Sequence, residues 1–212
     1  MTTLYFVRHG ESRANVDMVF TGQTDVPLSP RGEHQAKLLG EKLRSLPIDA
    51  IHASDLLRAV QTVTPAAEAL HLPIVREKGL REIYGGLWEG MYIPDIAKKY
   101  PTDYARWEED IGLARCTGGE SFEEVQRRGL ETVRRIAKEH DGQAVVIATH
   151  AAMIRALTCA FRGLPLSEMK HIPFVPNASL SEVHFEGGAF KIVSYADVSF
   201  LGGDVTKLPA NI

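Results

Sequence analysis

The chain has 212 residues, of which 44% are hydrophobic and 24% charged, and its formal net charge at pH 7 is −3. This length fits one large domain or two small ones, and the hydrophobic fraction is sufficient for a sizeable core. The mildly negative charge argues against a nucleic-acid partner or a polyanionic membrane surface.

The cysteines and the N-terminus indicate the cellular compartment in which we expect the protein. Cys116 and Cys159 form no CxxC pair, as expected of a reduced cytosolic protein. The N-terminus has no cationic segment and only a four-residue apolar run, so we expect no ordinary signal peptide and no membrane anchor. These features predict a cytoplasmic protein. Residues 177–179 match a glycosylation sequon, which we interpret as accidental because no secretion is expected.

The first part of the chain alternates between strand and helix patterns. Ser29 suits the N-cap of a helix, with Pro30 at its first position, and Ser54 is expected to cap the next helix. That next helix is expected to turn Leu57, Val60, Val63, Ala67 and Leu70 to one face. The expected elements, in chain order, are strand 4–7, a helix from residue 30 that ends before 47, strand 48–53, the helix after residue 54, and strand 72–75.

The second part opens with an unusual composition. Residues 84–107 hold four of the six tyrosines and both tryptophans, together with two prolines, and predict a helical insertion. Ser121 and Glu124 form a capping box that begins a long helix. A buried strand over 144–148, a further helix, and a hairpin over 179–185 and 189–195 follow. The tail from Gly202 to Ile212 is short and is expected either to be disordered or to fold over a neighbouring element.

These elements predict a single α/β domain over residues 1–212. We expect a three-layer sandwich, with a mainly parallel central sheet flanked by helices and a small helical insertion. In such sheets, ligands bind outside the carboxyl ends of the strands.

Two apolar strands end directly in a histidine, His9 and His150. If the strands are neighbours, the two imidazoles converge at one edge of the sheet. Arg8 can bind a phosphate in a bidentate fashion, and a histidine can act as a nucleophile. Arg58 lies at the start of a helix, where an anion is already favoured, and Glu82 is a plausible acid held by a loop. The pattern points to phosphoryl transfer.

Other phosphate-handling motifs do not fit this sequence. Neither cysteine is followed six positions later by arginine, no GxxxxGK[ST] segment occurs, and no Asp-x-Asp pair is present. His140 and Asp141 superficially suggest a metal site, but they lack the further ligands and are interpreted as a helix terminus.

Seven motifs occur in a defined order: Arg8–Ser12 with Asn15, Thr21–Gly22, Leu28–Gly32, Ala53–Thr62, Leu80–Glu82, Gly118–Ser121 and Thr149–His150. In this combination, and over nearly its whole length, the chain resembles the histidine phosphatase superfamily, also called phosphoglycerate mutase-like. The resemblance implies a phosphohistidine mechanism that needs no metal and no cofactor.

The resemblance also implies residue roles. His9 would be the nucleophile that becomes phosphorylated, Arg8, Arg58 and His150 would surround the phosphoryl group, and Glu82 would protonate the leaving alkoxide and then help to activate water. The residues expected to bind substrate are Asn15, Thr21, Gly22, Tyr84 and Arg115. One departure is that alanines 151 and 152 follow His150, where the family often has two glycines; alanine fits if those positions are helical.

Within the family, the compact segments over 80–90 and 118–121 resemble the phosphatase branch. The alternatives are a phosphoglycerate mutase and a non-catalytic phosphate-binding module. The substrate is expected to be a small phosphorylated metabolite, with α-ribazole phosphate, phosphoserine and phosphoglycerates as candidates. Residues 84–120 are expected to cap it. The oligomeric state is left open, with a homodimer as one option.

Overall fold

The computed structural model describes residues 1–206, and the part of the expected tail from 207 to 212 lies outside the described residues. The strands are β1 (Thr2–Arg8), β2 (Ala50–Ala53), β3 (Ile74–Arg76), β4 (Ala144–Thr149), β5 (Leu180–Glu186) and β6 (Ala189–Asp197). The α-helices are α1 (Arg13–Val16), α2 (Pro30–Arg44), α3 (Leu57–Leu70), α4 (Ile93–Lys99), α5 (Pro101–Glu109), α6 (Phe122–Glu139) and α7 (Ala151–Phe161). Short 3-10 helices are η1 (Lys78–Leu80), η2 (Gly86–Trp88), η3 (Ile111–Leu113), η4 (Leu166–His171) and η5 (Ser199–Asp204).

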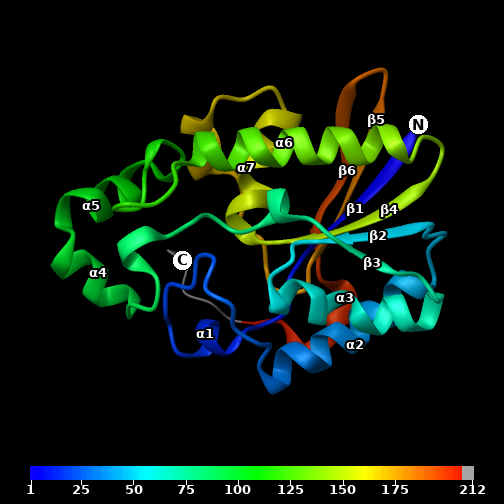
Figure 1. Ribbon diagram of the computed structural model, residues 1–212, viewed down its shortest axis with the longest axis horizontal. Helices are drawn as coiled ribbons and strands as arrows, with labels where there is room; N and C mark the ends of the chain where they lie inside the picture. Colours follow the sequence, from blue (N-terminus) through cyan, green and yellow to red (C-terminus); the bar gives the residue numbers. More distant parts are fainter. Residues whose placement is uncertain (207–212) are drawn as a thin grey trace.

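The strands form one six-stranded sheet in the order β3-β2-β4-β1-β5-β6 (Figure 1). Strands β3, β2, β4 and β1 pair in parallel, whereas β5 runs antiparallel to both of its neighbours, β1 and β6. The expected mainly parallel sheet is therefore confirmed, as is the hairpin formed by β5 and β6. Because β1 and β4 are adjacent and parallel, the residues that follow them meet at one edge of the sheet.

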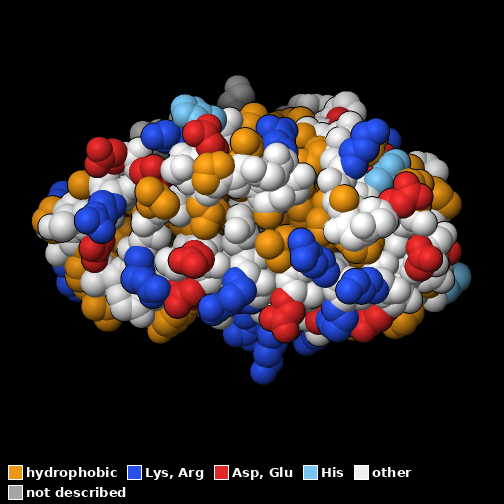
Figure 2. Space-filling view, turned by 90° about the horizontal axis from the view of Figure 1, so that it is seen from above, with side chains coloured by type: hydrophobic (Ala, Val, Ile, Leu, Met, Phe, Trp, Pro, Cys, Tyr) orange, Lys and Arg blue, Asp and Glu red, His pale blue; other side chains and the backbone are white. Residues whose placement is uncertain are grey.

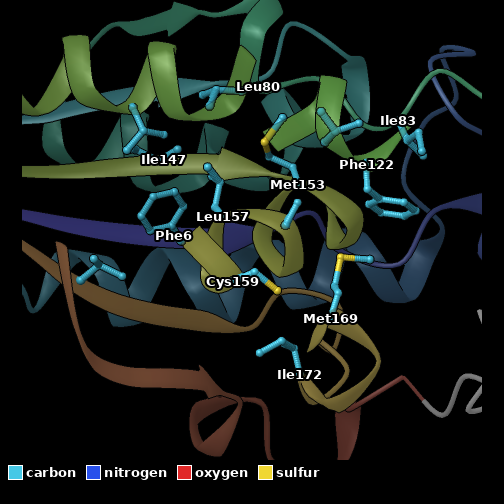
Figure 3. Close-up of a cluster of buried hydrophobic side chains, with 14 of the residues drawn as sticks. Phe6, Leu80, Ile83, Phe122, Ile147, Met153, Leu157, Cys159, Met169 and Ile172 are labelled. Carbon is cyan, nitrogen blue, oxygen red and sulfur yellow. The ribbon is translucent and has the colours of Figure 1, made fainter. Parts of the chain in front are cut away.

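Alternating residues of the central strands belong to two separate hydrophobic cores, one on each face of the sheet. Leu4 and Phe6 of β1 pack with α6 and α7, whereas Tyr5 and Val7 pack with α2 and α3. Figure 3 shows the first core, where Phe6 and Ile147 of the sheet lie beside side chains of α7. Burial on both faces explains the continuous apolar character of these strands and gives the expected three-layer arrangement.

Helix starts show where the expectations hold and where one fails. Ser29 accepts a hydrogen bond from the Gly32 N–H, and Ser121 forms the full capping box, so both predicted caps are confirmed. The predicted cap at Ser54 is wrong, since α3 begins at Leu57 without a local side-chain cap. Asp25, from a distant loop, accepts a hydrogen bond from the Leu57 N–H at 2.6 Å instead.

The inward face of α3 also differs from the expectation. Leu57 is 39% exposed, whereas Arg58, Ala59 and Thr62 are buried together with Val63. Val63 and Ala67 are buried as expected, but the apolar spacing does not identify Arg58 and Thr62, whose polar side chains are buried and serve the site described below.

The insertion between β3 and α6 is helical, as expected. Its helices α4 and α5 project beyond one end of the sheet (Figure 1). Its aromatic side chains make a compact cluster in which Trp88 and Trp107 pack with Phe20, and Trp107 also packs with Phe122. Trp88 is fully buried, and its indole N–H donates to Thr117. The aromatics of this segment thus stabilise the insertion itself.

Charged side chains of both signs are interspersed over the face above α6, with hydrophobic side chains exposed between them (Figure 2). Among the residues that the structure describes, no helix combines the length and the apolar character needed to cross a membrane.

Candidate active site

Two imidazoles lie together at the carboxyl edge of the sheet. Strand β1 leads into His9 and the neighbouring β4 leads into His150. Their ring centroids are 5.1 Å apart, and both side chains are buried, with His9 only 4% exposed. The predicted convergence of the two histidines is confirmed.

The backbone sets the tautomer of His9. Its Nδ1 lies 2.7 Å from the carbonyl oxygen of Gly10, which can only accept, so Nδ1 carries the proton. The lone pair is then on Nε2. Burial lowers the pKa of His9 well below its usual range, and the nearby cations Arg58 and Arg8 lower it further. His9 is therefore a neutral imidazole with a free nitrogen at pH 7.

His150 is fixed by a residue whose role the sequence did not indicate. Its Nε2 lies 2.8 Å from the hydroxyl oxygen of Ser54. Its other nitrogen, Nδ1, is buried and has no partner within residues 1–206. Burial and then Arg58 lower the pKa of His150 well below its usual range. An unpartnered ring nitrogen beside two cations is suited to a bound anion.

Two buried guanidinium groups flank the histidines. Arg8 donates to the Val175 carbonyl and lies 4.9 Å from the centroid of the Phe174 ring. Arg58, 1% exposed, donates to the carbonyls of Gly22 at 2.8 Å and Thr24 at 3.1 Å. Burial lowers the pKa of each to about 10, so both stay charged at neutral pH.

The loop that receives Arg58 depends on a glycine. Gly22 has φ +52°, and a Cβ there would lie 2.2 Å from a carboxylate oxygen of Glu89. Glu89 accepts hydrogen bonds from Gln23 at 2.7 Å and Thr24 at 2.7 Å. The carboxylate thereby holds the loop whose carbonyls orient the guanidinium.

Glu82 lies on a loop held by Arg128. Its carboxylate accepts from the Ile83 N–H at 2.9 Å and faces the Ala152 N–H at 3.4 Å. Arg128 donates to the carbonyls of Arg81 at 2.6 Å and Glu82 at 2.8 Å. Ala152 belongs to the first turn of α7, so the helical condition for alanine after His150 is met.

Arg128 is itself held by Glu120. The guanidinium makes two hydrogen bonds of 2.9 Å to this carboxylate, which also accepts from the Tyr84 N–H. A paired fork of this kind fixes orientation as well as charge.

Asn177 is a supporting residue of the site that no sequence motif indicated. It lies in the sequon but is fully buried, and its amide donates to the His9 carbonyl at 3.0 Å and to Asn15 at 3.3 Å. Thr62 acts similarly, because it accepts from the Gly10 N–H at 2.8 Å and donates to the Arg58 carbonyl. The spacing of Thr62 from Arg58 on one helix face was the available signal; Asn177 gave none beyond its sequon.

His9, the two arginines and Glu82 line one cavity, whose empty space is about 730 Å³ when the open solvent at its mouth is included. Of the residues expected to bind substrate, Asn15, Thr21 and Gly22 line it. The lining as a whole comprises Arg8, His9, Ser12, Asn15, Val19, Phe20, Thr21, Gly22, Arg58, Glu82, Ile83, Ile93, Trp107, Ile111, Phe122, Ala151, Ala152 and Arg155.

Tyr84 and Arg115, also expected to bind substrate, lie outside this lining. Tyr84 is 45% exposed. Arg115 donates to the Gly119 carbonyl and pairs with Glu124 at 2.9 Å, so its charge is engaged at the surface. The local ion pair of Arg115, which sequence spacing does not reveal, holds that side chain at the surface.

Comparison with known proteins agrees with this geometry. Residues 4–198 match the model of the histidine phosphatase superfamily, branch 1. Phosphoserine phosphatase 1 of Hydrogenobacter thermophilus is 37% identical over 186 residues, which are 88% of this chain and 88% of that protein. A metal-independent phosphoserine phosphatase of Arabidopsis thaliana is 30% identical over 207 residues, covering 95% of this chain and 84% of its own length.

A solved structure supports the same conclusion. YhfR of Bacillus stearothermophilus superposes with a TM-score of 0.91 at 33% sequence identity, covering 95% of this chain and 100% of that one. The family match spans nearly the whole chain, and the two histidines and two arginines lie together at the carboxyl edge of the sheet. The protein is a phosphomonoester hydrolase that belongs to the histidine phosphatase superfamily.

Proposed function

We propose that the protein hydrolyses small phosphomonoesters through a phosphohistidine on His9, without a metal. The observation that carries this proposal is the state of His9, a neutral imidazole whose tautomer is fixed through Nδ1 and which lies beside two buried, charged arginines. A nucleophile needs a free lone pair, and the phosphoryl group needs fixed positive charge.

In the first step, His9 Nε2 attacks phosphorus and the bond from phosphorus to the ester oxygen breaks. Arg8 and Arg58 stabilise the charge that spreads over the phosphoryl oxygens. The buried Nδ1 of His150 has no hydrogen-bond partner among residues 1–206, and a phosphoryl oxygen would supply one. Glu82, protonated, gives its proton to the departing alkoxide, so an alcohol leaves.

In the second step, water attacks the phosphohistidine. Glu82, now a carboxylate, takes a proton from the water, the bond from phosphorus to Nε2 breaks, and inorganic phosphate is released. His9 returns to its neutral form, and Glu82 is protonated again. The fixed tautomer serves both steps. Because Nδ1 keeps its proton, Nε2 is free to accept the phosphoryl group in the first step and to release it in the second.

The substrate class follows from the cavity and the relatives. The insertion contributes an apolar part of the lining with Ile93, Trp107 and Ile111, so we assign residues 84–120 as the cap of a one-domain enzyme. Two relatives are named phosphoserine phosphatases, which supports a small phosphorylated metabolite as substrate. The free, buried thiols of Cys116 and Cys159 support a reducing compartment such as the cytoplasm.

Acid-labile, alkali-stable phosphate should be trapped on the protein during turnover of p-nitrophenyl phosphate. His9→Ala should abolish both the trapped phosphate and the turnover. His184→Ala, which removes a histidine of β5 that pairs with Glu182, is the matched control and should retain both. Turnover by the His9→Ala variant would contradict the proposed nucleophile.

A second measurement separates hydrolysis from isomerisation. With 3-phosphoglycerate as substrate, inorganic phosphate and 2-phosphoglycerate are followed together. Release of phosphate is the expected result, whereas rapid isomerisation without phosphate release would identify a mutase. Binding of the substrate with no reaction of any kind would indicate a non-catalytic module.

A further inference from the structure

A third cation lines the cavity apart from the phosphoryl site. Arg155 lies on α7 one turn beyond Ala151, on the same face of the helix, and contributes to the cavity lining. It is five residues along the helix from His150, a rise of about 7.5 Å. Arg155 and the phosphoryl-binding arginines are therefore separate groups on one cavity.

The charge of Arg155 is not neutralised by the protein described here. One Nη atom donates to the Met169 carbonyl at 2.8 Å, and Nε is buried without a partner among residues 1–206. No aspartate or glutamate of that part of the chain forms an ion pair with it. Burial lowers the pKa of Arg155, while the neighbouring acids, Tyr195 and Cys159, are uncharged at pH 7.

The surroundings strengthen any interaction that this cation makes. The cavity lining also includes the uncharged Trp107, Ile111 and Phe122, and Glu82 is its one carboxylate, which forms no ion pair with Arg155. The side chain is half-buried, but its Nε is shielded from solvent without a partner among residues 1–206, and charge-assisted hydrogen bonds are stronger than neutral ones. An anion that enters with the ligand would supply this partner.

We propose that Arg155 is a specificity residue that binds a carboxylate on the leaving alcohol of the substrate. This inference rests on the proposed function and narrows it to phosphomonoesters of hydroxy acids. The phosphoryl group would lie with Arg8 and Arg58 while the carboxylate lies with Arg155, so the two ends of the substrate are recognised by different arginines.

The experiment compares 3-phosphoglycerate with glycerol 3-phosphate, in which a CH₂OH group replaces the carboxylate. The wild-type protein should have a kcat/KM roughly 10-fold or more higher for 3-phosphoglycerate. Arg155→Met should lower the ratio of the two kcat/KM values by roughly 10- to 100-fold, the loss expected for a hydrogen bond to a charged group. Arg155→Lys should restore part of the ratio because the charge is kept.

Arg162→Met is the matched control. It removes an arginine at the end of the same helix that lies over Tyr195 and outside the cavity lining, so the ratio should keep its wild-type value. An equal fall for both substrates in Arg155→Met would show that Arg155 only anchors η4 through Met169, and would overturn the inference.

Equal wild-type kcat/KM values for the two substrates would overturn the inference as well, whether or not any variant folds. Trapped phosphohistidine keeps the two claims distinguishable. If it forms but the ratio is insensitive to Arg155, only the carboxylate subsite fails. If none forms with any substrate, the proposed function fails.

Discussion

The two ends of the cavity are built in different ways. At the phosphoryl end, the side chains follow parallel strands or lie on α3, and backbone carbonyls fix both the His9 tautomer and the Arg58 fork. At the leaving-group end, side chains of the insertion and α7 present apolar surface and one arginine. Charge stabilisation in a transition state needs groups that are already oriented, whereas recognition of an alcohol needs shape and one matching charge. The chemistry can thus stay constant while a few side chains of the insertion change the substrate.

Of the substitutions considered, Glu82→Gln should lower kcat/KM the most, and the size of the fall should depend on the leaving group. A glutamine cannot give a proton, so kcat/KM for an alkyl phosphate should fall by roughly 10²–10⁴-fold. The fall should be much smaller for p-nitrophenyl phosphate, whose leaving group is stable as an anion. Steady-state kinetics on both substrates test this. Equal losses would argue that Glu82 does not act as the acid.

Arg58→Met should affect every substrate alike, because it removes charge stabilisation at phosphorus. We expect kcat to fall by roughly 10²–10³-fold for both alkyl and aryl phosphates. Arg134→Met, on the exposed face of α6, is the matched control and should leave kcat at its wild-type value. A fall in kcat for only one class of leaving group would contradict the assignment of Arg58 to the phosphoryl end of the cavity.

Arg128→Met should give a smaller effect of the same kind as Glu82→Gln. Arg128 touches no reacting atom, but it holds the carbonyl of Glu82 and pairs with Glu120. We expect roughly a 10-fold fall in kcat/KM for alkyl phosphates, the scale of one lost hydrogen bond to a charged group. The aryl phosphate should be much less affected. A fall of equal size on both would point to general loosening of the fold instead.

The pH dependence of stability should report the buried imidazoles. Above about pH 6.5, His9 is neutral in both the folded and the unfolded chain and contributes nothing. Below that pH, the unfolded chain takes up a proton that the folded chain excludes, because burial lowers the pKa of His9, so stability is lost as the pH falls.

Denaturant titrations between about pH 6 and pH 5 measure this contribution. His9→Asn should reduce the slope of the unfolding free energy by about 1.4 kcal/mol per pH unit, the linkage of one proton. An unchanged slope would mean that His9 is protonated in the folded protein, which would remove the free lone pair from the proposed mechanism.

The sequence predicted the parts of the site that follow directly from strand order. His9 and His150 end two apolar runs, and adjacency of parallel strands brings them together. Ser54 was misassigned because the actual cap, Asp25, comes from a loop 32 residues away. No sequence motif indicated a role for Arg155, since only the fold shows that its helix lines the cavity and that no described carboxylate pairs with it.

Asn177 has a consequence for how the protein can be produced. Its side chain is fully buried against the His9 carbonyl, although residues 177–179 form a sequon. In a secretory pathway, a glycan would be attached to the extended chain before this segment closes over β1. The folded protein has no room for a sugar at that position, so each glycosylated molecule would fail to complete its catalytic centre. Secretion from a eukaryotic host should therefore yield active protein only from the unmodified fraction.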